Sequence, residues 1–443
     1  MFQVSTRTIC DALLLLTLLS VGLALPAHAA NEDGVFVSNE SVLLGGAARS
    51  VVSDGSAAWL NPARLTQIER VSVMGNLNAL RLSHQRIPRA LQVEGDGSLD
   101  LQETNVSILP GSMSLGTALN DRLVLGAGVF VTKSQVGNES LHLASTVGDQ
   151  SNDLVIGVTN RDQDYNAVLA LGWKANERSS YGLTLTFRYG RQAYTLANWS
   201  IVSNAVKEEI SALTIQQQLT RAGLGLIIGG DWQLNDSVVL TAVVQTPMLM
   251  LVNSERSLIV DSYSQSGPDD QIRYSVDSIR TLSADARALG SLRMHVGVAW
   301  NPDPLLLTGE LELRMEPQVS NGGYIAVWNA RIGLQHEIKE GVTVGGGIFT
   351  DLTQRIPLSE FYDTNVQYLG ASVGGRFTKV IRLAPEERTR TIERTTVIGA
   401  RYMAGIGQFN GAILHLDGSD PTLRNIRYVE HELSLYLGAE FAF

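Results

Sequence analysis

Apolar and polar residues alternate along most of this chain, and the final segment shows the pattern best. Val429, Leu433, Leu437 and Phe443 share one face with other apolar residues, whereas Glu430 and the residues that alternate with it occupy the other face. The alternation runs for about fifteen residues, which exceeds the ~5–6 residues of an ordinary strand. It is long enough for a tilted strand that crosses a membrane, so we predict one at the C-terminus.

The same period of two recurs along the chain and predicts an all-β fold, a transmembrane antiparallel β-barrel of about 14 strands. An even number places both termini in the periplasm, as in single-chain bacterial barrels. The charged segment 379–391 is long for a periplasmic turn, and the count could change by one hairpin there. The predicted strands lie near 70–84, 103–118, 123–134, 163–175, 180–195, 212–233, 237–252, 286–300, 305–317, 323–338, 342–353, 364–378, 392–408 and 426–443.

Short and long connections alternate between these strands. Tight turns such as Asn120-Asp121 and Asn235-Asp236 contain good turn formers. Long polar stretches, expected to be outer loops, lie near 85–102, 135–162, 196–213, 253–287, 354–363 and 409–425. Alternation alone also fits a soluble barrel with its apolar rows inside. The turn pattern favours a membrane barrel, as do four aromatic residues beside the short turns, Trp173, Tyr181, Trp232 and Trp300.

The first residues have the three parts of a secretory signal peptide. Arg7 lies in a short n-region, an apolar run covers 12–25, and small residues follow up to Ala30. The apolar run is shorter than the ~20 residues of a membrane-spanning helix, which disfavours the alternative of a permanent anchor. We therefore predict a signal peptide over 1–29, cleavage after Ala29 and an outer-membrane location. The terminal Phe443 predicts recognition by the barrel-assembly machinery.

Composition excludes several classes of site. The one cysteine, Cys10, lies within the signal, so the mature chain has no disulfide and no cysteine-based metal site. The formal net charge of −10 is unsuited to binding nucleic acid. The histidines have no metal-ligand spacing, and Gly345 to Gly347 lack the Lys-Ser/Thr of a phosphate loop. We expect no metal, no cofactor and no enzyme activity; an outer-membrane lipase is a minor alternative, without a Gly-x-Ser-x-Gly motif.

Residues 30–69 do not resemble membrane strands. They are rich in small residues and contain Asp54, Trp59 and the triplet Asn61-Pro62-Ala63. A barrel as wide as 70–443 would enclose water unless something filled it. We therefore predict that 30–69 fold back as a plug, with Trp59 packed against the wall.

This region of the chain resembles the FadL-type family of outer-membrane transporters. The matching features are the run of small residues, Asp54, the Asn61-Pro62-Ala63 triplet and the early first strand. The resemblance is specific over about 42–66 and architectural elsewhere. It implies that the N-terminal segment is a hatch and that substrates leave sideways through a gap beside a kinked strand. It also implies that the cargo is a hydrophobic compound such as a long-chain fatty acid, with outer-membrane lipid as the other partner.

Two strand interruptions are candidates for such a gap. Proline cannot donate a ladder hydrogen bond, so Pro110-Gly111 and Pro247 each indicate a bulge or an opening. Pro110-Gly111 is the better candidate, because glycine adds backbone freedom.

A second candidate surface for apolar ligands is a short amphipathic helix over 197–213, which alternatively only packs on neighbouring loops. Its apolar face would hold Ile201, Val202, Val206, Ile210 and Leu213, opposite Lys207, Glu208 and Glu209.

Charged residues predicted to face the lumen have two interpretations. They either brace the barrel interior or provide an arginine site for a substrate carboxylate. They are Arg188, Arg293, Glu310, Glu312, Arg314, Arg331, Glu337, Arg401, Glu430 and Glu432.

Transport of hydrophobic compounds is the first hypothesis for function. A surface or scaffold protein using 253–287 for contacts is the second, and a general porin, which a plug would close, is the third.

Overall fold

The computed structural model describes residues 35–443 except for several short internal segments. These are 94–96, 110, 148–149, 204–207, 267–270, 284–287, 317–324, 355–363, 384–389 and 415–421. The predicted signal peptide, 1–29, lies outside the described residues, as does Pro110. In the part of the chain that is described, no helix has the length and apolarity needed to span a membrane.

The strands form one antiparallel barrel, which closes where β18 (Thr422–Ala442) pairs with β1 (Ser72–Val93). Between them lie β2 (Gly97–Leu109), β3 (Met113–Ala118), β4 (Leu123–Val147), β5 (Gln150–Asn176), β6 (Ser179–Ser203), β7 (Glu208–Asn235), β8 (Val238–Gln245), β9 (Met248–Ser266), β10 (Gln271–Ser283), β11 (Ala288–Leu289), β12 (Arg293–Trp300), β13 (Leu305–Arg314), β14 (Val327–Lys339), β15 (Val342–Asp351), β16 (Thr364–Leu383) and β17 (Arg390–Leu414).

Three of the wall strands are interrupted, which reconciles these segments with the predicted count of fourteen. β2 and β3 together make the second wall strand, β8 and β9 the seventh, and β10, β11 and β12 the eighth. The seventh strand breaks at Thr246-Pro247, where proline has no N–H to donate. The break between β2 and β3 contains Pro110-Gly111. The predicted barrel of fourteen strands is therefore confirmed.

Exposure of the apolar rows identifies which face meets lipid. Val373 and Leu369 are more than 60% exposed, whereas Glu432 on the inward face is 1% exposed. A soluble barrel would show the reverse. Trp173, Tyr181 and Trp232 lie in contact beside the short turns, with ring centroids 6.1 Å apart in each neighbouring pair. Together with the exposed Trp300 they form the predicted aromatic girdle.

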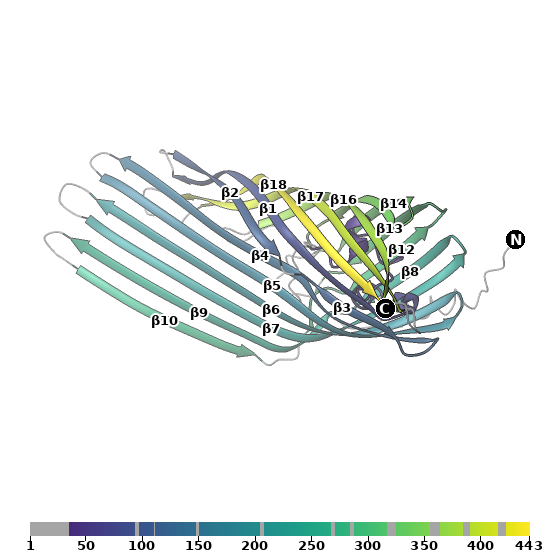
Figure 1. Ribbon diagram of the computed structural model, residues 1–443. Helices are drawn as coiled ribbons and strands as arrows, with labels where there is room; N and C mark the ends of the chain where they lie inside the picture. Colours follow the sequence, from purple (N-terminus) through teal and green to yellow (C-terminus); the bar gives the residue numbers. More distant parts are fainter. Residues whose placement is uncertain are drawn as a thin grey trace.

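Several stretches expected to be loops are strand instead. β4, β5, β6, β7, β9 and β10 continue well beyond the other strands and build one tall side of the barrel, hereafter the tall wall (Figure 1). Residues 135–162, 196–213 and 253–287 belong largely to this wall. The linker 379–391 is likewise mostly the ends of β16 and β17, with 384–389 outside the described residues.

The prediction of an amphipathic helix over 197–213 is wrong, because its described residues lie in β6 and β7. Ile201 on β6 pairs directly with Ile210 on β7, and Val202 and Leu213 also lie in these strands, whereas Val206 is outside the described residues. A short isolated helix is marginal in water. Because β5 and β9 flank this hairpin, ladder hydrogen bonds satisfy its backbone on both sides.

The N-terminal segment lies inside the barrel. It contains α2 (Asn39–Leu43), α3 (Ala57–Leu60) and a 3-10 helix, η1 (Pro62–Gln67). Ser38 caps α2 by accepting a hydrogen bond from the Ser41 N–H at 3.0 Å. Most of the residues from Val35 to Leu65 are buried. This segment, 35–68, therefore fills part of the lumen, which a barrel of this width would otherwise leave to water.

Candidate functional site

A floor of three glycines supports the Asn61-Pro62 turn of the segment. Gly172, Gly182 and Gly229 lie opposite one another on β5, β6 and β7. A Cβ at Gly182 would lie 2.2 Å from the carbonyl carbon of Pro62, and one at Gly229 would lie 2.2 Å from Asn61 Oδ1. Any side chain at these two positions would collide with the segment, so glycine is required for this close approach.

A second glycine floor lies across the lumen beneath α2 and the residues that follow it. Gly333 on β14 pairs with Gly347 on β15, and a Cβ at Gly333 would lie 2.7 Å from the Leu44 Cα. Three further glycines in register continue the floor under Val42 and Leu43, namely Gly345, Gly374 and Gly399. The Gly-Gly-Gly run, unsuited to phosphate binding, therefore contributes backbone on which the segment rests.

Asp54 and Asn61 organise the segment from within. The buried Asp54 carboxylate accepts hydrogen bonds from the N–H, at 2.7 Å, and the hydroxyl of Ser56, just before α3. Asn61 Oδ1 accepts from the Ala63 N–H at 3.2 Å, and Asn61 Nδ2 donates to the Arg49 carbonyl at 3.0 Å. Burial raises the pKa of Asp54 to about 6, against the lowering effect of the Ser56 donors.

Three ion pairs join the segment to separate strands of the wall. Arg49 meets Glu310 of β13 at 2.5 Å, and Arg64 meets Asp231 of β7 at 3.2 Å. Glu40 pairs with Arg376 of β16. Breaking a buried pair leaves an uncompensated charge, so each pair resists displacement of the segment.

Trp59 contacts the wall. Its ring stacks on the fully buried Phe130 of β4, with centroids 5.9 Å apart. Stacked aromatic pairs contribute ~0.5–1.5 kcal/mol beyond the area they bury.

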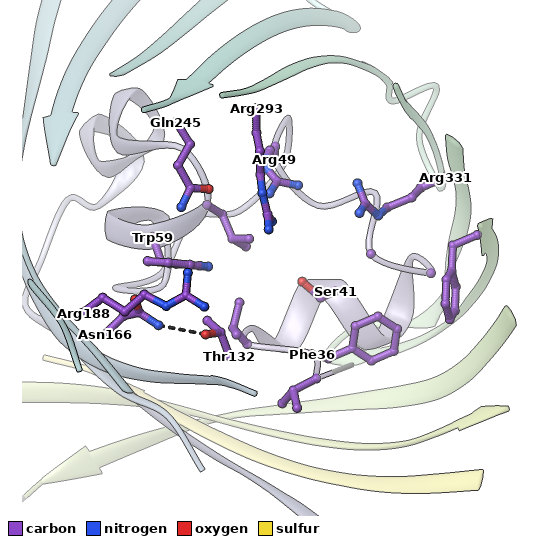
Figure 2. A pocket seen from close by; sticks show the side chains of 16 residues that line it. Phe36, Ser41, Arg49, Trp59, Thr132, Asn166, Arg188, Gln245, Arg293 and Arg331 are labelled. Carbon is purple, nitrogen blue, oxygen red and sulfur yellow. Dashed lines mark hydrogen bonds between the residues drawn. The ribbon is translucent and has the colours of Figure 1, made fainter. Parts of the chain in front are cut away.

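A pocket remains between the segment and the wall (Figure 2). Its apolar lining comes mainly from Val35, Phe36, Trp59 and Leu60 of the segment and from Phe349 of β15. Its polar lining includes four guanidinium groups and no carboxylate; these belong to Arg49, Arg188, Arg293 and Arg331. Apolar walls with a few polar groups are typical of small-molecule sites.

The charges behind this pocket brace the lumen. Arg331 donates to Glu310 at 2.9 Å and to Glu312 at 2.7 Å, and Arg314 donates to Glu312 at 2.7 Å. Arg188 pairs with Asp164 at 2.5 Å. The first of the two interpretations of the lumen charges is thus observed for these residues.

The backbone ladder of the wall is interrupted on one side of the β2–β3 break, and this interruption between β2 and β4 is hereafter called the gap. β3 pairs with β4 as far as Met113 opposite Val129, and β2 pairs with β1. Among the described residues, no ladder joins β2 to β4 beyond that point. Thr132 of β4, just beyond the end of the ladder, also lines the pocket. The gap in the wall therefore lies beside the pocket.

Asn76 of β1 ties this gap to the segment. Its side chain accepts from the Ser112 N–H at 3.0 Å and donates to the Val37 carbonyl at 2.9 Å. A Cβ at Gly111 would lie 1.7 Å from the Asn76 carbonyl oxygen. Only glycine fits there, so the break expected at Pro110-Gly111 is present in the backbone at Gly111.

Solved structures share this architecture. A Pseudomonas aeruginosa FadL homologue covers 95% of this chain and 100% of its own, at 12% identity and a TM-score of 0.59. The Pseudomonas putida toluene transporter TodX covers 93% of this chain and 99% of its own, at 12% identity and a TM-score of 0.59. This chain has the FadL-type fold. The Ralstonia pickettii toluene transporter TbuX shares this fold at 11% identity and a TM-score of 0.52. The match covers 93% of this chain and 99% of TbuX. No family model and no curated protein matches the sequence.

The structure brings together most of the residues singled out in the sequence. Asp54, Trp59, Asn61, Pro62 and Ala63 all lie in the lumen segment. The glycine floors and Asn76 were not predicted. Glycines at alternate, inward positions of neighbouring strands are the signal that would have located the floors.

Proposed function

We propose that the protein is an outer-membrane channel for hydrophobic compounds. The observation that carries this proposal is the gap between β2 and β4, which lies beside a pocket lined by the segment and by aromatic side chains. A compound released sideways through such a gap enters lipid and avoids water. The FadL-type fold, shared with two transporters of toluene, supports the same function.

The pocket lining supports a narrower proposal for the cargo, an amphipathic compound with a carboxylate, such as a long-chain fatty acid. Four arginines line the pocket beside its apolar surface. Each is also within 4 Å of a carboxylate of the wall, so a substrate carboxylate would share these guanidinium groups with the wall. Guanidinium groups recognise carboxylates through paired N–H donors. An uncharged aromatic hydrocarbon would use the apolar part alone.

The test places the purified protein in lipid vesicles and follows two solutes. We expect uptake of a labelled long-chain fatty acid without permeation of small sugars, because the segment occupies part of the lumen and would block polar solutes. Sugar permeation without fatty-acid uptake would make the protein a general porin. The absence of both activities would favour a scaffold protein. Uptake of toluene but not of fatty acid would support the channel function and contradict the proposal that the cargo carries a carboxylate.

A further inference from the structure

Three exposed arginines lie on the outward face of the tall wall, just above the lipid-facing rows. They are Arg161 on β5, Arg191 on β6 and Arg256 on β9. Strand side chains alternate between faces, so Arg191 shares the face of the exposed Leu183 and Phe187 on the same strand. Arg161 likewise shares the face of the exposed Leu171 on β5.

Strand register places the three side chains in one patch. Arg161 lies opposite Ala193, which lies opposite Gln218, which in turn lies opposite Arg256. Three strand spacings separate Arg161 from Arg256, or about 15 Å. Arg191 is a diagonal neighbour of Arg161, at roughly 7–8 Å. These three residues are hereafter the basic patch.

Height along the strands places the patch at the outer edge of the membrane. Arg191 lies ten positions beyond the girdle residue Tyr181, and Arg161 lies twelve positions before Trp173. At ~3.3 Å per residue and a tilt of ~40°, these offsets rise about 25 and 30 Å. The apolar band of an outer-membrane barrel is ~25 Å tall. The arginines therefore lie at the level of lipid headgroups on the side opposite the short turns.

The charges at this height are divided between the two faces of the wall. On the inward face, Asp162 pairs with Lys133 at 2.6 Å and Asp164 with Arg188 at 2.5 Å. On the outward face, the neighbours of Arg161 and Arg191 are uncharged, for example Gln163, Thr195 and Thr220. The strand register places a further arginine, Arg280 of β10, opposite Arg256. None of the ion pairs found among the described residues involves the basic patch.

We propose that the basic patch binds the phosphate groups of a lipid in the outer leaflet. A guanidinium matches phosphate with two parallel N–H donors, and three of them within about 15 Å suit a headgroup with more than one phosphate. The acyl chains of the same lipid would continue down the exposed apolar rows below the patch. This binding site is on the outer surface and is independent of the pocket and of transport.

The test measures lipid binding to the purified barrel in detergent by native mass spectrometry. The probe is lipid A, a bisphosphorylated glucosamine disaccharide lipid, compared with its fully dephosphorylated form and with inorganic phosphate as competitor. The variant is Arg161→Gln/Arg191→Gln/Arg256→Gln. The matched control, Arg122→Gln/Arg178→Gln/Lys339→Gln, removes the same charge from exposed residues at the short-turn end. Resistance of the barrel to heating in detergent shows that each variant has folded.

We expect the wild type and the control to bind lipid A equally, and the patch variant to bind it at least about tenfold more weakly. The dephosphorylated lipid should bind as weakly as lipid A binds to the patch variant. Three results would overturn the proposal: equal binding by the patch variant, an equal loss in the control, or equal binding of the dephosphorylated lipid. Displacement by equimolar inorganic phosphate would identify a phosphate-ion site in place of a lipid site.

Discussion

The side-chain oxygen of Asn76 accepts a hydrogen bond from the Ser112 N–H at 3.0 Å, at the break between β2 and β3. The same amide donates to the Val37 carbonyl of the lumen segment. One buried side chain thus connects the segment with the edge of the wall gap. We therefore expect movement of the segment to change the width of the gap through this residue.

Replacing Asn76 should disturb the gap without unfolding the barrel. Asn76→Ala removes both hydrogen bonds and leaves the Ser112 N–H and the Val37 carbonyl without this partner, at a cost of about 1–3 kcal/mol each. We expect fatty-acid uptake into vesicles to fall severalfold, with heat resistance in detergent retained. Asn425→Ala, which removes an exposed amide on β18, is the control. Unchanged uptake by Asn76→Ala would show that the contact has no part in transport.

Adding a side chain to the first glycine floor should expel the segment. In Gly182→Leu the new Cβ would meet Pro62 at 2.2 Å, a distance that no rotamer relieves. The lumen should then open, and vesicles carrying the variant should admit small sugars that the wild type excludes.

Gly309→Leu is the matched control for this experiment, because a Cβ at Gly309 would have its nearest neighbour 3.8 Å away, at Val298. It should leave the vesicles closed to sugars. If Gly182→Leu also stayed closed while remaining folded, the segment would not be the element that fills the lumen.

Docking of the segment should weaken as pH rises. Because burial raises the pKa of Asp54 from 3.8 to about 6, the docked state holds the proton more tightly than the released state. The resulting stabilisation is fully present below about pH 3.8 and is lost as pH rises through about 6; it amounts to roughly 3 kcal/mol. Glu40, Arg376 and Glu440 of β18 are the charged groups that also act on this carboxyl.

Channel current in planar bilayers between pH 4.5 and 8 measures this effect. Openings should be more frequent at pH 8 than at pH 4.5 in the wild type. In Asp54→Asn, which cannot ionise at this position, the difference should become smaller. A wild type whose openings increase toward acid would contradict the assigned pKa shift.

The barrel was predictable from sequence because lipid imposes an unbroken apolar row on each crossing strand. Leu433 and Leu435 face outward while Glu432 and Ser434 face the lumen, as the alternation indicated. The tall wall was not predictable in this way, because above the membrane neither face needs to be apolar. Segments such as 135–162 consequently resemble loops in sequence, although their backbone pairs along nearly its whole length.

The lumen segment was partly predictable from the sequence, but the glycine floor that supports it was not. Asn61-Pro62-Ala63 marked a turn in the segment, and Trp59 an anchor. The floor on which that turn rests depends on Gly172, Gly182 and Gly229 being in register across three strands. Single glycines in strands are common, and only the pairing of the strands shows that these three are adjacent.

Photo-cross-linking with a fatty acid that carries a diazirine near the end of its chain tests the central claim most directly. The protein, in lipid vesicles, is irradiated during uptake, and the labelled peptides are mapped by mass spectrometry. The account predicts label on the segment around Val35 to Val37 and on both borders of the gap, β2 and the part of β4 around Thr132. Label confined to the outward faces of β12 to β16, with none on the segment or the gap, would contradict it.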